Sequence, residues 1–162
     1  MVGAAGGKGF DVVHPSFDQF NVLSTALLCG SFKYQGQKCF ATCRSYIPRS
    51  LWHALKERFI EDLPKVKVGD VLDFYNFVNV VHEKAAYESI MSYINYAKSH
   101  DGQMVYGGVG SDDIGDYIQP TVQELKYPFL RPCRRNFLSW AFHEDEKLEE
   151  VLELVDETFL YA

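Results

Sequence analysis

Residues 32–52 read FKYQGQKCFATCRSYIPRSLW, and they contain the end of one predicted helix, a predicted strand and the start of a second predicted helix. Gly36 is expected to end a preceding helix, because glycine readily adopts the left-handed conformation found at helix C-termini. The alternating residues Phe40–Ile47 are typical of a strand. Apolar residues four positions apart then predict a helix over Leu51–Asp62. A helix, a strand and a second helix in succession indicate an α/β structure.

The flanking sequence continues this alternation. Ser16 followed by Gln19 has the pattern of a capping box, so we expect a helix over Phe17–Tyr34. The remaining periodic segments predict helices over 83–99 and 145–158, and strands over 11–14, 104–106, 117–124 and 137–142. Strands that alternate with helices predict an α/β layer structure with a mainly parallel sheet.

Composition restricts the partners of this chain. Its 162 residues fit a single domain, and its 47% hydrophobic content suffices for a packed core. The net charge of -6 comes without a basic patch, so no nucleic-acid partner is expected. No apolar run reaches the roughly 18 residues of a membrane span, so no membrane partner is expected. The N-terminal residues show no secretory or transit signal.

Four cysteines are present, and one of them is the best candidate for chemistry. Without a secretory signal, free thiols are favoured over disulfides. Cys39 and Cys43 have the spacing of half a zinc site, but no second pair follows, so no metal is expected. Cys39 falls between the predicted helix and strand, where a thiol can be reached by a substrate. The alternative is a buried structural thiol, which we expect for Cys29 and Cys43.

Four stretches together resemble the catalytic domain of aldehyde dehydrogenases. They are 32–39, 46–52, 66–70 and 152–158, and Gly6-Gly7-Lys8 resembles the end of the family element Glu-x-Gly-Gly-Lys. The branch with the greatest similarity is Δ1-pyrroline-5-carboxylate (L-glutamate γ-semialdehyde) dehydrogenase. Gly-Gln-x-Cys alone is a weak signal, whereas four matches in register are specific. The resemblance implies that 1–162 is one partial catalytic domain of three-layer α/β structure with a mainly parallel sheet. The match is good over 1–127, diverges over 128–143 and returns over 144–162.

The resemblance places Cys39 at the nucleophile position. In the family, a thiolate attacks the aldehyde carbon, hydride passes to NAD, and base-activated water hydrolyses the resulting thioester. The resemblance thus implies NAD as cofactor and a small-molecule aldehyde as substrate, oxidised to L-glutamate in proline catabolism. It also implies a homo-oligomer, or a hetero-oligomer with a full-length dehydrogenase, and the mitochondrial matrix as compartment.

Several aligned positions depart from the family. Ala4 stands at the general-base position, and alanine cannot accept a proton. Arg135 stands where a Glu binds the nicotinamide ribose, although Phe137 fits the Phe of that motif. Phe40 replaces the Ser that follows the nucleophile in the semialdehyde branch. The family's Rossmann-type NAD-binding domain is not recognisable in this chain, and the glycine-rich opening lacks the spacing to replace it.

These departures lead to three expectations about activity. The first is a truncated, inactive homologue in which Cys39 remains a reactive thiol. The second is a non-catalytic binding partner of a full-length paralogue. The third is an incomplete version of a longer, active NAD-dependent dehydrogenase sequence.

Overall fold

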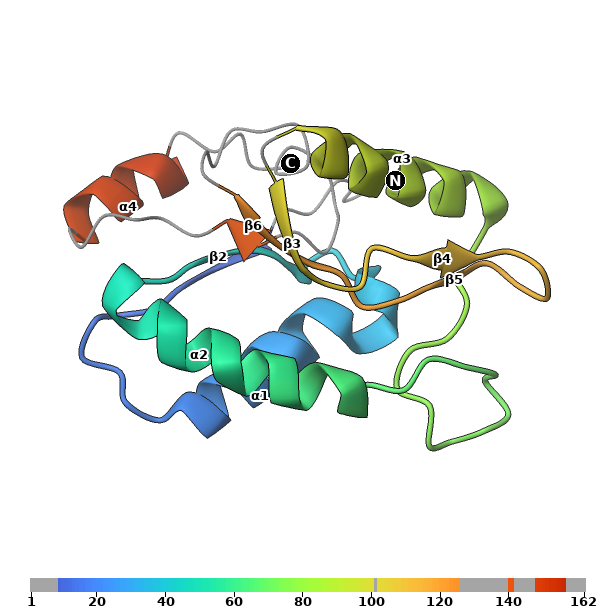
Figure 1. The fold of residues 1–162 in the computed structure, drawn as a ribbon, viewed down its shortest axis with the longest axis horizontal. Coiled ribbons are helices and arrows are strands. Elements are labelled where there is room, and N and C mark those ends of the chain that lie inside the picture. The colour runs from blue at the N-terminus through green and yellow to red at the C-terminus, as the bar shows by residue number, and fades with distance from the viewer. Residues whose placement is uncertain (1–8, 101, 126–139, 142–147, 157–162) are drawn as a thin grey trace, which may run out of the picture.

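Helices lie on both sides of a layer of strands. The computed structural model describes residues 9–100, 102–125, 140–141 and 148–156. Figure 1 shows α1 (Phe20–Phe32) and α2 (Arg49–Asp62) on one side of the strands, and α3 (Lys84–Ser99) and α4 (Leu148–Asp156) on the other. This arrangement confirms the predicted three-layer α/β class. Among the described residues, no helix combines the length and the apolar character that crossing a bilayer requires.

Two parallel strand pairs make up most of the strand layer. Strand β1 (Gly9–Val12) pairs in parallel with β2 (Thr42–Tyr46), and β6 (Val122–Leu125) pairs in parallel with β7 (Trp140–Ala141). Strand β2 contacts β7, which brings the two pairs side by side. Strand β3 (Gly102–Tyr106) joins β6 in antiparallel orientation, so the layer is mixed. The short hairpin of β4 (Gly110–Ser111) and β5 (Tyr117–Ile118) extends from it.

Helix α1 begins later than the sequence predicts. Gln19 is the N-cap and makes no side-chain capping bond, so the predicted capping box is wrong. The physical reason is a turn before the helix, in which the Phe17 N–H donates to the His14 carbonyl at 3.0 Å. Ser16 Oγ lies 2.8 Å from His14 Nδ1 and is therefore engaged within this turn. Cys29, on α1, is exposed, which contradicts its expected place in the core.

A continuous apolar core lies between α1, α2 and the strands. Leu55, Phe59 and Leu63 are at most 1% exposed and pack with Phe32 of α1. Helix α2 confirms its prediction to within two residues and passes into the short 3₁₀ helix η2 (Leu63–Lys65). Proline in η2 cannot donate the N–H that a longer α-helix requires. Helix α3 confirms its prediction to within one residue at its start.

The predicted strand over 117–124 is divided in two. Strand β5 ends at Ile118 and β6 begins at Val122. Pro120 lies between them and has no N–H for a strand ladder, while the Gln119 N–H donates to the Val109 carbonyl at 2.9 Å. The loop before β5, predicted to be irregular, contains β4.

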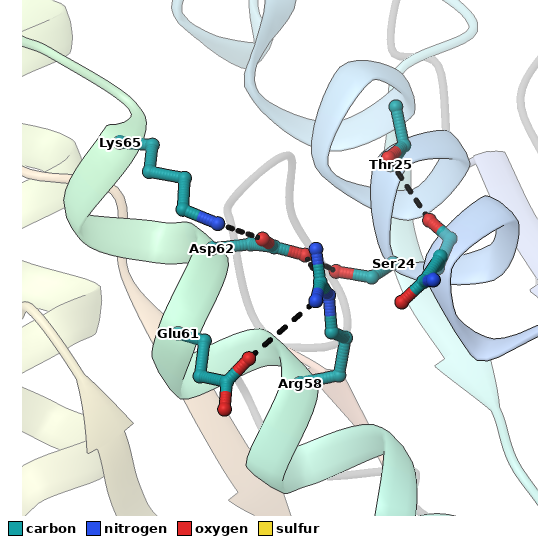
Figure 2. Close-up of polar contacts among 7 residues, drawn as sticks. Ser24, Thr25, Arg58, Glu61, Asp62 and Lys65 are labelled. Atoms are coloured by element: carbon teal, nitrogen blue, oxygen red, sulfur yellow. Dashed lines mark hydrogen bonds and ion pairs between the residues drawn. The ribbon is translucent and has the colours of Figure 1, made fainter.

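A buried carboxylate joins α1 to the end of α2 (Figure 2). Asp62 is 7% exposed and accepts hydrogen bonds from three side chains. The donors are Ser24 Oγ at 2.7 Å, Arg58 Nε at 2.8 Å and Lys65 Nζ at 2.7 Å. Burial raises the pKa of Asp62, but the three donors outweigh this effect and hold the pKa below its ordinary value of 3.8. Folding therefore favours the charged form of Asp62 over the protonated form.

Candidate active site

A left-handed run of backbone presents Cys39. The 3₁₀ helix η1 (Lys33–Gly36) follows α1, and Tyr34, Gln35 and Gly36 have φ of 54°, 57° and 67°. Such values are rare outside glycine and reverse the direction of the chain. A turn then follows, closed by the Ala41 N–H donating to the Lys38 carbonyl at 3.1 Å. Cys39 lies inside this turn, immediately before β2, as the sequence predicts.

The thiol is accessible, and aromatic side chains surround its turn. Cys39 is exposed, so the alternative of a buried structural thiol is wrong for this residue; Cys43, on β2, is buried as expected. Phe40 and Tyr34 are 72% and 63% exposed. The Lys38 ammonium lies 4.7 Å from the Tyr34 ring centroid and 5.1 Å from that of Phe40, within cation–π range.

The backbone of the turn supplies a candidate oxyanion donor. Across residues 9–100, 102–125, 140–141 and 148–156, no protein group accepts a hydrogen bond from the Cys39 N–H. An N–H on the attacking residue itself can donate to the oxygen that becomes negative when a thiolate adds to a carbonyl. The turn thus combines an accessible sulfur with a donor for the developing charge.

Two glutamines attach this region to the segment before α3. The Gln37 Oε1 accepts from the His82 backbone N–H at 3.2 Å, and Gln37 Nε2 lies 2.9 Å from His82 Nδ1. The Gln35 amide makes a second pair of contacts. Its nitrogen donates to the Tyr34 carbonyl at 2.9 Å, and its oxygen accepts from the Asn79 N–H at 2.9 Å. The cysteine turn is therefore held from residues more than forty positions further along the chain.

A small apolar hollow lies next to η1. It is lined by Phe32, Gln35, Val78, Asn79, Val81, Ile90, Ile118 and Pro120. No carboxylate lines it, although a ribose hydroxyl is normally bound by one in nicotinamide sites. This hollow therefore lacks the carboxylate that a nicotinamide ribose normally meets.

The other predicted site positions lie elsewhere in the chain. Ala4, Arg135 and Phe137 fall outside the described residues, so their roles stay predictions. In the described part of the molecule, no three His, Cys, Asp or Glu side chains gather as a metal ion requires. The Gln37–His82 contact was not predicted. In the sequence, the glutamine of Gly-Gln-x-Cys is the only sign of this contact, because its partner His82 lies 45 residues further along the chain.

The sequence matches the aldehyde dehydrogenase family over residues 2–126. The chain belongs to the aldehyde dehydrogenase family. Cys39, its turn and β2 all fall within the matched region.

Individual relatives agree with the predicted branch. The chain is 38% identical over 167 residues to a mitochondrial Δ1-pyrroline-5-carboxylate dehydrogenase of Dictyostelium discoideum, and 35% identical over 169 residues to the human mitochondrial enzyme of the same name. Each match covers 100% of this chain and 30% of the relative. The chain thus spans about a third of the length of these relatives.

A solved structure with the same name shows the same fold. The Δ-pyrroline-5-carboxylate dehydrogenase of Mycobacterium tuberculosis, solved with NAD and cobalamin bound, superposes with a TM-score of 0.89 at 32% identity. The superposition covers 99% of this chain and 30% of that one. The resemblance to the pyrroline-5-carboxylate branch is thereby confirmed, and NAD use is a property of the family.

Proposed function

We propose that this chain is the cysteine-bearing catalytic part of a Δ1-pyrroline-5-carboxylate-type dehydrogenase, and that Cys39 attacks the aldehyde carbon of L-glutamate γ-semialdehyde. The observation that carries the proposal is that Cys39 is exposed and that its N–H has no acceptor among the residues that the structure describes. Both features fall in the region that matches the family.

The first chemical step needs only this turn. The Cys39 thiolate adds to the aldehyde carbon, a C–S bond forms, and the carbonyl π electrons move to the oxygen. The Cys39 N–H stabilises this oxygen until it takes a proton, which completes a thiohemiacetal. NAD, when bound, supplies the hydride acceptor of the family reaction.

We further propose that the chain itself does not turn over. Alanine at position 4 cannot activate water, and loss of a general base costs about 10²–10⁴ in rate. Arginine at position 135 offers no acceptor to a ribose hydroxyl. With an aldehyde alone, the expected adduct is the reversible thiohemiacetal, because its oxidation to a thioester needs bound NAD. An acyl group that an activated ester places directly on Cys39 should persist, since no base at position 4 activates water for its hydrolysis.

A single-turnover ester assay tests this proposal. With p-nitrophenyl acetate, Cys39 attacks the acyl carbon, the ester C–O bond breaks, p-nitrophenolate leaves, and acetyl-Cys39 remains. We expect one equivalent of p-nitrophenolate, an acetyl group on the Cys39 peptide by mass spectrometry, and no steady release thereafter. The Cys39→Ala variant should lose the burst. The matched variant Cys29→Ala, which removes another exposed thiol, should keep it.

The complete reaction provides a second test. The purified chain, incubated with NAD and L-glutamate γ-semialdehyde, is expected to give no sustained NADH. Continued NADH production that depends on Cys39 would show that turnover does not need a carboxylate at position 4, and would overturn the proposed inactivity.

We also propose the mitochondrial matrix and proline breakdown as the setting of this chemistry. Support comes from the relatives, several of which are mitochondrial enzymes by name. Subcellular fractionation of the native source, with detection of peptides from this chain, tests the compartment. The mass of the native protein, compared with 18.5 kDa, shows in the same experiment whether these residues work within a longer chain.

A further inference from the structure

Gln37 and His82 meet in two contacts beside the cysteine turn, which comprises residues 38–41. The Gln37 amide can satisfy the His82 N–H only if its oxygen faces that donor, and the oxygen lies 3.2 Å from it. The amide nitrogen then faces His82 Nδ1 at 2.9 Å. Two donors cannot share a hydrogen bond, so Nδ1 must be the acceptor. The geometry therefore assigns the tautomer with the proton on Nε2, which lies 3.3 Å from Glu83 Oε1.

Protonation of His82 makes this arrangement impossible. An imidazolium carries a hydrogen on Nδ1, so the histidine presents two donors, its own N–H and Nδ1–H. The Gln37 amide has one acceptor group to offer. In either orientation, one of the two hydrogen bonds across the contact is lost. The contact is therefore complete only while His82 is neutral.

We propose that His82 is a positioning residue for Cys39, acting through Gln37. Neutral His82 holds the cysteine turn for attack, and protonated His82 releases it. This inference rests on the proposed nucleophilic role of Cys39. It matters because Gln37 lies two positions before Cys39, whose N–H must meet the developing oxyanion. When Gln37 loses a hydrogen bond to His82, the Cys39 N–H can adopt a wider range of orientations.

The surrounding charges do not provide an alternative switch. Glu83 is the carboxylate next to the imidazole, with Oε1 3.3 Å from His82 Nε2. His82 lies just before the first turn of α3. Lys84, the next cation, is paired with the carboxylates of Asp112 and Asp116 in the loop between β4 and β5. Lys38 of the turn lies over two aromatic rings.

The test is a pH profile of Cys39 acylation by p-nitrophenyl acetate. The reference variant is His82→Asn, because asparagine Oδ1, like Nδ1, is bonded to Cγ and accepts a hydrogen bond at every pH. Ionisation of Cys39 affects both proteins, so the quotient of their rates reports on residue 82. We expect a quotient near one at about pH 8, falling about threefold to tenfold by about pH 5.5, as loss of one hydrogen bond predicts.

Two further variants complete the test. His82→Ala should be slow at both pH values, and His53→Ala, which removes an exposed histidine of α2, should follow the wild type. A quotient that stays constant with pH, or a His82→Ala rate equal to the wild-type rate at pH 8, overturns the inference while the proposed function stands. A wild type whose Cys39 is not acylated at any pH overturns both.

The tautomer gives an independent measurement. Nitrogen chemical shifts of His82 at about pH 8 should show an unprotonated Nδ1 in the wild type. In Gln37→Ala, that preference should weaken. A proton on Nδ1 in the wild type contradicts the contact described above, whatever the acylation rates are.

Discussion

At the scale of single residues, position 4 is expected to decide how long an acyl group stays on Cys39. Alignment of Gly6-Gly7-Lys8 with the family element puts Ala4 where the family has its general base. We predict that Ala4→Glu accelerates hydrolysis of acetyl-Cys39 by about 10²–10⁴, because the carboxylate can take a proton from water. Loss of the acetyl group is followed by mass spectrometry. Ala4→Gln, which cannot act as a base, is the control, and equal rates in both variants contradict the assignment.

Asp62 makes the stability of the fold depend on pH. Its pKa is lower in the folded state than the ordinary 3.8, so its contribution is complete above that value and is lost as pH falls through the folded pKa. We predict that Asp62→Asn lowers the free energy of unfolding by about 1–3 kcal/mol at pH 7. The difference from wild type should narrow below about pH 4, in urea titrations at several pH values.

A neighbouring carboxylate is the control for Asp62. Glu61 meets Arg58 at 3.5 Å and its side chain is 67% exposed, so Glu61→Gln should change stability by less than about 0.5 kcal/mol. An equal loss in both variants contradicts a specific role for the buried contacts of Asp62 with α1.

Sequence and structure agree on Cys39 but not on its neighbours. The thiol is found in the sequence because its motif is contiguous, and its exposure follows from its place between a helix and a strand. The partners of Gln35 and Gln37 lie at positions 79 and 82, and nothing local to either segment indicates the pairing. Cys29 was misplaced because the small residues around it do not reveal which side of α1 faces solvent.

At the scale of secondary-structure elements, Gly107 fixes the connection after β3. Its φ is 74°, and a Cβ there would overlap the carbonyl oxygen of Pro120. We predict that Gly107→Ala lowers the free energy of unfolding by more than about 2 kcal/mol, since backbone strain and overlap add. Chemical denaturation measures this loss.

Gly36 provides the comparison for Gly107. It also has a positive φ, 67°, but no described residue comes close to a Cβ at this position. Gly36→Ala should therefore cost only the left-handed strain, about 1–2 kcal/mol. A Gly36→Ala variant that loses as much stability as Gly107→Ala would show that the Pro120 contact can relax.

Element boundaries were predictable only where periodicity alone decides them. Helices α2 and α3 agree with their apolar spacing to within two residues at their starts. The start of α1 was missed because Ser16 bonds to His14 rather than capping the helix, a choice that local pattern does not reveal. The division between β5 and β6 could have been predicted from Pro120, which cannot join a ladder.

At the scale of the whole molecule, the core between α1 and α2 supports the cysteine turn. Phe59 is 1% exposed within this core, so Phe59→Ala should cost about 3–5 kcal/mol. Phe74 is 97% exposed in the loop after Val68, and Phe74→Ala should change stability by less than about 0.5 kcal/mol. Thermal and urea unfolding of the pair test this. Similar losses for both would contradict the described core.

The layered arrangement was predictable, whereas the strand order was not. Alternating helices and strands require helices on both faces of a sheet, as observed. The lateral position of β7 beside β2 is set by contacts between segments almost a hundred residues apart. Periodicity gives no information on such neighbours, and for this reason the antiparallel β3 was not expected beside β6.

The burial of β2 has a consequence for the backbone on either side of Cys39. Every residue from Ala41 to Pro48 is buried, whereas Cys39 and Phe40 are exposed. Amide protons of β2 should therefore exchange with deuterated solvent far more slowly than those of the turn. Over two or three residues, the chain passes from buried backbone to backbone open to water. Cys39 is thus joined to a buried strand on its C-terminal side and held on its N-terminal side by the Gln37 contacts with His82, while its own side chain faces solvent.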